Sequence, residues 1–220
     1  MADKLYRIIL VFMVLAVMAE VRAVEPAQTF SLDGNLEDWK GMAPLMVLNQ
    51  KVQLKESPGN WQGPGDLSGS FFFSTDTQSL WIAIDVVDDN SLWCPRGLDL
   101  QAPWWKITYD GDAARIKLQD KNNQSVELFI YPGQYGVRPQ VYFKNAEASK
   151  LIILEGAEIL SSFKKETPGY QVEVKIPLAS LKIKPSDSQV EIELFDSDGP
   201  PRSCKSIKGS ASFPTGVPVS

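Results

Sequence analysis

The chain has 220 residues with 22 Lys+Arg and 27 Asp+Glu, and its formal net charge is −5. This acidic balance disfavours nucleic acid and anionic membrane surfaces as partners, because both call for a basic face. Histidine is absent, which excludes Ser-His-Asp and Cys-His catalysis and histidine-ligated zinc.

The N-terminal residues 1–23 have the pattern of a signal peptide. Lys4 and Arg7 precede an apolar run of about twelve residues, which is too short to cross a hydrocarbon core of roughly 30 Å. Ala23 offers a small residue for cleavage. We therefore expect export to a secreted or periplasmic location, with residues 24–220 forming a single domain that has no membrane span. The alternative is that residues 1–23 are retained as a membrane anchor.

Apolar residues then recur at every second position, which predicts β-strands with one buried face. Charged residues stand between them, as expected for antiparallel sheets with one face in water; examples are Glu173, Lys175, Glu191 and Glu193. Further strands are predicted at 69–74, 113–120, 137–144, 151–158 and 205–213, and a helical turn at 177–181. The alternating apolar rows are Leu80, Ile82, Ile84 and Val86; Val126, Leu128 and Ile130; Val172, Val174 and Ile176; Val190, Ile192 and Leu194.

Turn sequences separate these strands, including Asp110-Gly111, Pro132-Gly133 and Pro168-Gly169. About 8–10 short antiparallel strands at this spacing predict an all-β sandwich. The stretch 55–68 is rich in Gly, Pro and Asn, so we expect a long loop there. Long loops on a sandwich are common places for function.

Several segments between residues 30 and 213, taken in chain order, resemble the family 9 carbohydrate-binding modules and their DOMON-like relatives. The resemblance implies an immunoglobulin-like or DOMON-like antiparallel β-sandwich whose loops at one end bind the terminal sugars of a polysaccharide, often with structural calcium nearby. The segments are Leu32-Asp33-Gly34-Asn35-Leu36-Glu37-Asp38-Trp39, then 63–69, 80–89, Asp110-Gly111-Asp112-Ala113, 169–177 and 194–199.

Two departures from the family pattern concern the sugar site. The last strand lacks the tryptophan that sugar-binding members use there, and the stretch between Asp89 and Asp110 carries unusual aromatic residues and a cysteine. The same fold also serves haem-binding and purely structural relatives, so fold alone does not decide function.

Tryptophan carries the case for sugar, because an indole face stacks on the C–H patch of a pyranose while planar polar side chains bond its hydroxyls. Two loops combine both residue types. The predicted carbohydrate-binding residues are Trp61, Trp93, Trp104, Asn60, Gln62, Asn90 and Arg96. The alternative is that these rings pack over the rim of the core, which is the role we expect for Trp39 and Trp81.

Two acidic stretches at predicted strand ends favour calcium, which prefers oxygen ligands. We expect Asp88, Asp89, Asp196 and Asp198 to be its ligands, the alternative being solvated turns. The chain has two cysteines, Cys94 and Cys204, and in an exported protein we expect them to form a disulfide that closes a loop of about 110 residues.

The leading hypothesis is an exported, non-catalytic carbohydrate-binding module, acting alone or beside an envelope or secreted enzyme. A second is a structural or interaction sandwich without a small ligand. A third is a DOMON-like haem module, whose axial ligands would have to be Met42, Met46 or a lysine such as Lys106. A glycosidase built on paired carboxylates is the remaining alternative, and we expect no enzyme.

Overall fold

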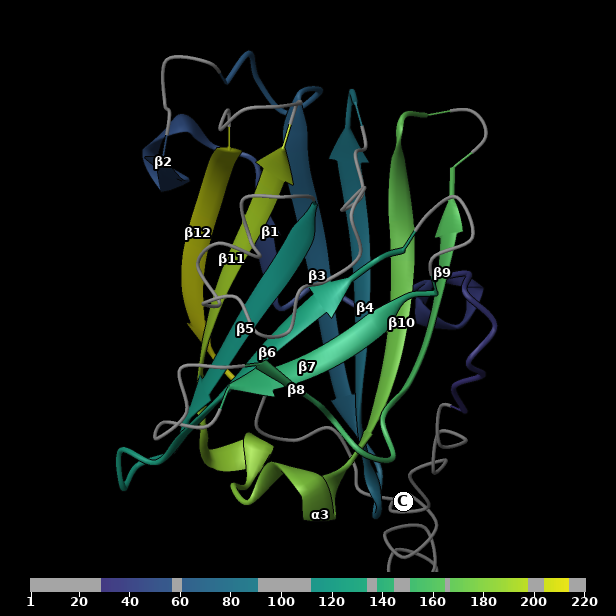
Figure 1. Cartoon of the computed structure of the whole chain (residues 1–220), viewed down its shortest axis with the longest axis vertical. Coiled ribbons are helices and arrows are strands. Elements are labelled where there is room, and N and C mark those ends of the chain that lie inside the picture. The colour runs from purple at the N-terminus through teal and green to yellow at the C-terminus, as the bar shows by residue number, and fades with distance from the viewer. Residues whose placement is uncertain are drawn as a thin grey trace, which may run out of the picture.

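A computed structural model describes residues 29–56, 61–90, 112–133, 138–144, 151–164, 167–197 and 204–213. They form two antiparallel sheets that face each other as a sandwich (Figure 1). Sheet A has the strand order β1-β3-β4-β10-β9, and sheet B has the order β2-β12-β11-β5-β6-β7-β8. The all-β sandwich predicted from the sequence is therefore confirmed.

The strands of sheet A are β1 (Met46–Leu48), β3 (Leu67–Thr75), β4 (Ser79–Asp88), β9 (Glu158–Phe163) and β10 (Gly169–Pro177). Those of sheet B are β2 (Leu54–Glu56), β5 (Ala113–Gln119), β6 (Ser125–Tyr131), β7 (Gln140–Lys144), β8 (Leu151–Ile153), β11 (Gln189–Ser197) and β12 (Cys204–Ser212). The short helical elements are η1 (Glu37–Trp39), η2 (Lys51–Gln53), α3 (Leu178–Leu181) and η3 (Pro185–Asp187).

One predicted strand is wrong. The stretch 151–158 is not continuous, because β8 belongs to sheet B and β9 to sheet A. Between them Gly156 adopts a φ of 75°, a left-handed conformation that suits glycine and turns the chain from one sheet to the other. This division raises the number of strands in the described residues to twelve.

The core lies between the sheets and is built from the alternating rows that the sequence predicts. Each row turns its apolar side chains inward, because successive side chains of a strand point to opposite faces. Fully buried members come from β4, β10, β5, β6 and β11, among them Ile82, Ile84, Val174, Ile116, Leu128 and Ile192.

A second, smaller apolar cluster covers the outer face of sheet A. It is centred on Trp39 and Trp81, and the partly buried Phe30, Leu32 and Leu36 pack against it. Both tryptophans are buried, as expected for packing residues. The N-terminal segment 29–45 therefore closes over a sheet face that the alternation predicted to be wet.

Glu173 shows how this cover is attached. Its carboxylate lies on the outer face of β10 and accepts hydrogen bonds from Trp39 Nε1 (2.9 Å), the Asp33 N–H (3.0 Å) and the Gly34 N–H (2.8 Å). The side chain is fully buried, and burial raises its pKa even though these hydrogen bonds act to lower it. The expectation that Glu173 faces water is wrong, because a distant segment covers it.

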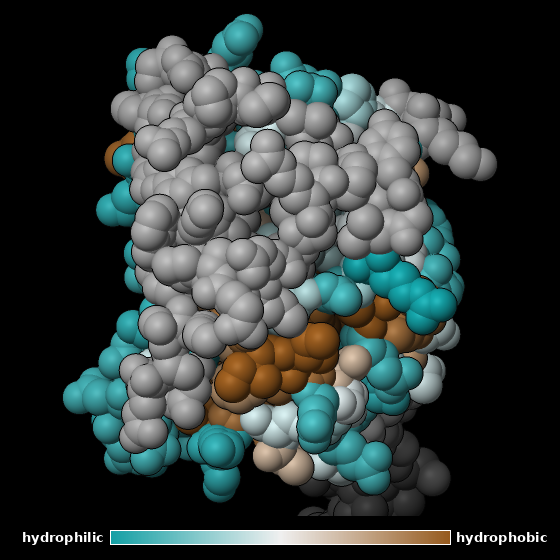
Figure 2. All heavy atoms as spheres, in the orientation of Figure 1, coloured by the Kyte–Doolittle hydropathy of each residue, from teal (hydrophilic) through white to brown (hydrophobic). Residues whose placement is uncertain are grey.

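The face of sheet B that is turned to the viewer in Figure 1 is partly apolar. Figure 2 shows hydrophobic side chains gathered on its lower half, where β7 and β8 run. The edge strand β8 leaves Ile152 and Ile153 exposed at 47% and 51%. Among the described residues, no helix is long and apolar enough to cross a membrane.

Candidate functional site

The apolar rows of several strands end in polar side chains at the same end of the sandwich. The row of β4 runs from Leu80 to Val86 and continues in phase to Asp88, and the row of β11 continues in phase to Asp196. Asp112 stands two residues before Ala114, at the start of the row of β5. Because the period is two, all three carboxylates point inward, and they are 1%, 0% and 2% exposed.

These three side chains converge. One carboxylate oxygen from each of Asp88, Asp112 and Asp196 lies within 4.8 Å of the others. Asp112 Oδ1 also accepts the Ser197 N–H at 3.1 Å, which ties the start of β5 to the end of β11. Burial raises the pKa of Asp112 well above its usual range, and the neighbouring Asp88 raises it further. The cluster therefore brings three carboxyl groups together in the interior, where burial and mutual repulsion both disfavour ionisation of Asp112.

Lys205 brings one positive charge to this cluster. It is 1% exposed at the start of β12, directly opposite Asp196 in the register, and its Nζ lies 3.0 Å from Asp196 Oδ2. The same ammonium donates to Asp66 Oδ1, whose other oxygen accepts the Gln62 N–H at 2.7 Å. The ion pair therefore links the segment before β3 to the carboxylate cluster.

Tyr170 completes the polar end of the core. It begins the inward row of β10 and pairs with Val86, the residue that precedes Asp88 in the inward row of β4. Its ring is 2% exposed, and within the described residues its hydroxyl has no hydrogen-bond partner. Burial raises the pKa of this hydroxyl well above its usual range, and so do the charges of Asp112, Asp88 and Asp196, in that order. The hydroxyl thus lies within the field of the cluster.

This polar end is also the end from which the predicted sugar loops leave. β4 and β11 both point to the upper end of Figure 1, while α3 lies at the lower end. The described residues that flank three connections lie beside the cluster: Asp66 before β3, Asp88 and Asp112 on the two sides of the β4–β5 connection, and Asp196 and Lys205 on the two sides of the β11–β12 connection.

No family model matches the sequence, and no curated protein matches it significantly. The structure, however, is similar to a family 9 carbohydrate-binding module from Caldicellulosiruptor kristjanssonii solved with cellotriose. The two share 15% identity and a TM-score of 0.55 over 82% of this chain and 79% of that one. The fold is that of the family 9 carbohydrate-binding modules. A glucose complex of a family 9 module from the same organism gives 14% identity and a TM-score of 0.53, over 82% of this chain and 81% of that one.

The predicted sugar-binding residues are placed only in part on this family 9 fold. Trp61 is half-buried against the core, and its Nε1 donates to the Leu67 carbonyl at 3.0 Å. Gln62 and Asn90 are exposed at the polar end. Asn60, Trp93, Trp104 and Arg96 lie outside the described residues. The ring of Trp61 therefore contributes to packing, whatever else it contacts.

The predicted calcium ligands divide in the same way. Asp88 and Asp196 come together as expected, whereas Asp89 is exposed because it is out of phase with the buried row of β4. Asp198 lies outside the described residues, and so does Cys94, which leaves the disulfide with Cys204 a prediction. Sequence reasoning missed Asp112, although its position two residues before an inward alanine was a usable signal.

The methionines of the haem hypothesis lie on opposite faces of sheet A. Met42 packs on the outer cluster beside Trp39, whereas Met46 belongs to the core between the sheets. A single haem iron therefore does not have both as axial ligands in this arrangement. Lys106, the other candidate, lies outside the described residues.

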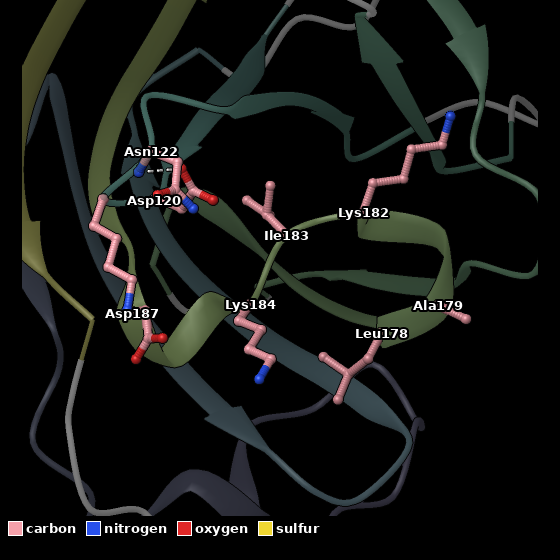
Figure 3. A pocket seen from close by; sticks show the side chains of 9 residues that line it. Asp120, Asn122, Leu178, Ala179, Lys182, Ile183, Lys184 and Asp187 are labelled. Atoms are coloured by element: carbon pink, nitrogen blue, oxygen red, sulfur yellow. Dashed lines mark hydrogen bonds between the residues drawn. The ribbon is translucent and has the colours of Figure 1, made fainter.

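A pocket of about 480 Å³ lies at the opposite end of the family 9 fold, beside α3 (Figure 3). Its lining offers no aromatic ring on which a sugar could stack, and its charges are of both signs. The lining residues are Asp120, Lys121, Asn122, Leu178, Ala179, Lys182, Ile183, Lys184 and Asp187. This end does not match the chemistry expected of a sugar site.

Proposed function

We propose that the chain is an exported, non-catalytic carbohydrate-binding module that holds the end of a polysaccharide or oligosaccharide at the polar end of the sandwich. The observation that carries the proposal is the likeness of its fold to family 9 modules solved with cellotriose and glucose, over 82% of the chain. The predicted aromatic and polar residues belong to segments that leave from this same end, which supports placing the sugar there.

The proposed mechanism is stacking combined with hydrogen bonding. Trp93 and Trp104 supply ring faces, and Trp61 supports the rim from its half-buried position. Asn60, Gln62, Asn90 and Arg96 offer donors and acceptors for sugar hydroxyls. The Lys205 ion pairs tie the segment before β3 to the end of β11. This part of the polar end therefore loses less conformational entropy when a ligand binds than a free loop would.

Calorimetric titration with cellotriose, together with a glycan array, tests the proposal. Trp93→Ala is expected to weaken binding about tenfold or more, which corresponds to about 1.4 kcal/mol of lost contact. Its melting temperature should stay close to that of the unchanged protein, since loop rings contribute contact with the ligand rather than core volume. Trp61→Ala is expected to lower both affinity and stability, because Trp61 also packs against the core.

Trp81 supplies the matched control, because its ring is buried on the outer face of sheet A and its Nε1 bonds to Asp76 at 2.8 Å. Trp81→Ala should cost about 3–5 kcal/mol of stability through cavity formation and leave affinity unchanged. If no array glycan binds the folded protein, the carbohydrate proposal is wrong. N-terminal sequencing of the secreted protein tests export separately, and the expected first residue is Val24.

The packing of Trp61 favours a second candidate, a structural or interaction sandwich without a small ligand. This reading requires that Trp61→Ala and Trp93→Ala both destabilise the fold as much as Trp81→Ala does. A protein partner recovered in place of a sugar would support it.

A further inference from the structure

We propose that Lys205 and Asp66 condense in the folded chain to form an intramolecular amide bond, with Asp196 as the group that carries the proton. The bond joins the side-chain nitrogen of Lys205 to Cγ of Asp66, and one water molecule is released. The chain supplies every reacting group, so the step needs no oxidant, reductant or other co-reactant. The proposal does not depend on sugar binding.

The two reacting groups are in contact. Lys205 Nζ lies 2.5 Å from Asp66 Oδ1. Because Oδ1 is bonded to Cγ, the nitrogen is at most one covalent bond length further from the carbon that it attacks. Both groups are held in place: Lys205 pairs with Asp196 in the sheet register, and the Asp66 N–H donates to the Gly63 carbonyl at 3.0 Å. Groups held in this way react as if at an effective concentration of about 10⁵–10⁸ M.

Burial favours the amide over the ion pair. The side chains of Lys205, Asp66 and Asp196 are 1%, 4% and 0% exposed. In water an ammonium and a carboxylate are stabilised by hydration, which opposes their condensation. The interior removes that hydration, and this is costly for two ions but much less so for an uncharged amide. It also limits the access of water that could hydrolyse the product.

A backbone donor is already placed for the intermediate. Attack on Cγ moves negative charge onto the second carboxylate oxygen of Asp66, Oδ2. This oxygen accepts the Gln62 N–H at 2.7 Å. A backbone N–H directed at the oxygen on which charge develops is the arrangement that stabilises the tetrahedral intermediates of acyl transfer. Oδ2 therefore becomes the carbonyl oxygen of the amide, and Oδ1 is the oxygen that leaves.

Asp196 is placed to move the proton, because its Oδ2 lies 3.0 Å from Lys205 Nζ. The ammonium first gives one proton to Asp66 Oδ1, and the freed lone pair of the nitrogen forms the bond to Cγ. Asp196 then takes a second proton from the nitrogen and delivers it to Oδ1, as a general base followed by a general acid. The Cγ–Oδ1 bond breaks and Oδ1 leaves as water. The third proton stays on the amide nitrogen, and Asp196 ends ionised, as it began.

The bond would connect the two sheets covalently at the polar end. Asp66 directly precedes β3 of sheet A and Lys205 belongs to β12 of sheet B, and the two residues are 139 positions apart. A cross-link between such distant residues restricts the unfolded chain, since the ends of a long loop no longer separate. The amide would keep this restriction under reducing conditions, where a disulfide is lost.

The mass of the whole mature protein tests the proposal. After denaturation and reduction, the chain should be lighter by one water molecule than the mass calculated from its sequence and its determined N-terminus. This measurement needs no variant to fold. A plain ion pair separates on denaturation and leaves the full calculated mass, so a chain of full mass would overturn the proposal.

Tryptic mapping locates the bond. Asp66 and Lys205 belong to the fragments 56–96 and 203–208, and trypsin does not cleave after a lysine whose nitrogen is an amide. The two fragments should therefore remain joined after reduction and alkylation. Reduction is essential, because the same fragments contain Cys94 and Cys204, whose expected disulfide would also join them. Fragments that separate on reduction would contradict the amide.

Variants separate the roles of the three residues. Lys205→Arg keeps a cation beside the carboxylates but lacks the amine, so it should have its full mass. Asp66→Asn can still condense, with ammonia as the leaving group in place of water, and should reach the same final mass as the cross-linked unchanged protein. Asp196→Asn loses the proton carrier, which is typically responsible for a factor of about 10²–10⁴ in rate, and should be recovered mainly with its full mass.

Lys208→Arg is the matched control. Lys208 lies on the same strand and forms an ion pair with Glu191 at 2.8 Å, but these side chains are 24% and 34% exposed, so water stabilises the ions there. This variant should keep the loss of one water. If Lys205→Arg also keeps it, the water is lost elsewhere in the chain and the proposal is wrong.

Discussion

The attachment of the N-terminal segment to Glu173 leads to a sharp prediction. In Glu173→Gln the side chain keeps its size but has only one acceptor oxygen. That oxygen can face the Asp33 and Gly34 N–H groups or the Trp39 indole N–H, whereas the carboxylate accepts from all three. Whichever way the amide turns, its NH2 group meets at least one buried donor.

The cost follows from the hydrogen bonds that are lost. A buried donor left without an acceptor costs about 1–3 kcal/mol, and bonds to a charged acceptor lie at the upper end of that range. We therefore expect Glu173→Gln to lower the free energy of unfolding by about 2–3 kcal/mol. Glu173→Ala removes all three acceptor contacts and should cost about 3–5 kcal/mol.

Urea unfolding followed by circular dichroism measures this difference, and tryptophan fluorescence reports on Trp39 in the cover itself. Glu158→Gln provides the control. Its carboxylate makes a surface contact with Lys175 at 3.4 Å and is 59% exposed, so its change should stay within about 0.5 kcal/mol. If Glu173→Gln is as mild as Glu158→Gln, the three hydrogen bonds do not hold the cover and the reasoning fails.

Three further changes probe other parts of the fold. Burial acts to raise the pKa of Asp76, but hydrogen bonds from Trp81 and two backbone N–H groups lower it overall. The ionised Asp76 carboxylate therefore stabilises the fold fully above pH 3.8, the usual pKa of an aspartate, and this stabilisation is lost as the pH falls through the lower pKa of the folded state. In Asp76→Asn, the free energy of unfolding should depend less on pH in this acid range. Lys205→Met leaves two buried carboxylates without their ammonium and should cost about 3–5 kcal/mol by urea unfolding; a change under 1 kcal/mol would mean that they are neutralised by other means. At Gly169, φ is 124° and an added Cβ would lie 2.2 Å from the Val86 carbonyl oxygen, so Gly169→Ala should cost at least about 2 kcal/mol in the same assay, and a variant as stable as the unchanged protein would contradict this geometry.

Period-two alternation was sufficient to predict the inward rows, since burial of one sheet face is a local property of each strand. Asp88 and Asp196 continue apolar rows in phase, so their burial follows from spacing alone, and the same rule applied to Asp112 and Tyr170 completes the cluster.

Other features could not be predicted in this way. The burial of Glu173 depends on a segment about 140 residues away in sequence, and no local pattern carries that contact. Gly156 did mark the turn between β8 and β9, but the apolar residues on both sides made one strand plausible. The ion pairs of Lys205 with Asp66 and Asp196 likewise join β12, the segment before β3 and the end of β11. These three parts of the chain meet only when the sheets form.

The cover over sheet A also constrains the order of folding. Asp33, Gly34 and Trp39 bond to a residue 134 to 140 positions later, so they are synthesised long before their acceptor exists. Contacts of such separation form late, because the entropy of closing the intervening chain must be lost first. Until β10 arrives, the aromatic rings of the leading segment have no surface on which to dock. The apolar side chains of segment 29–45 therefore remain open to aggregation until β10 is made, and a chaperone that shields this segment would assist folding.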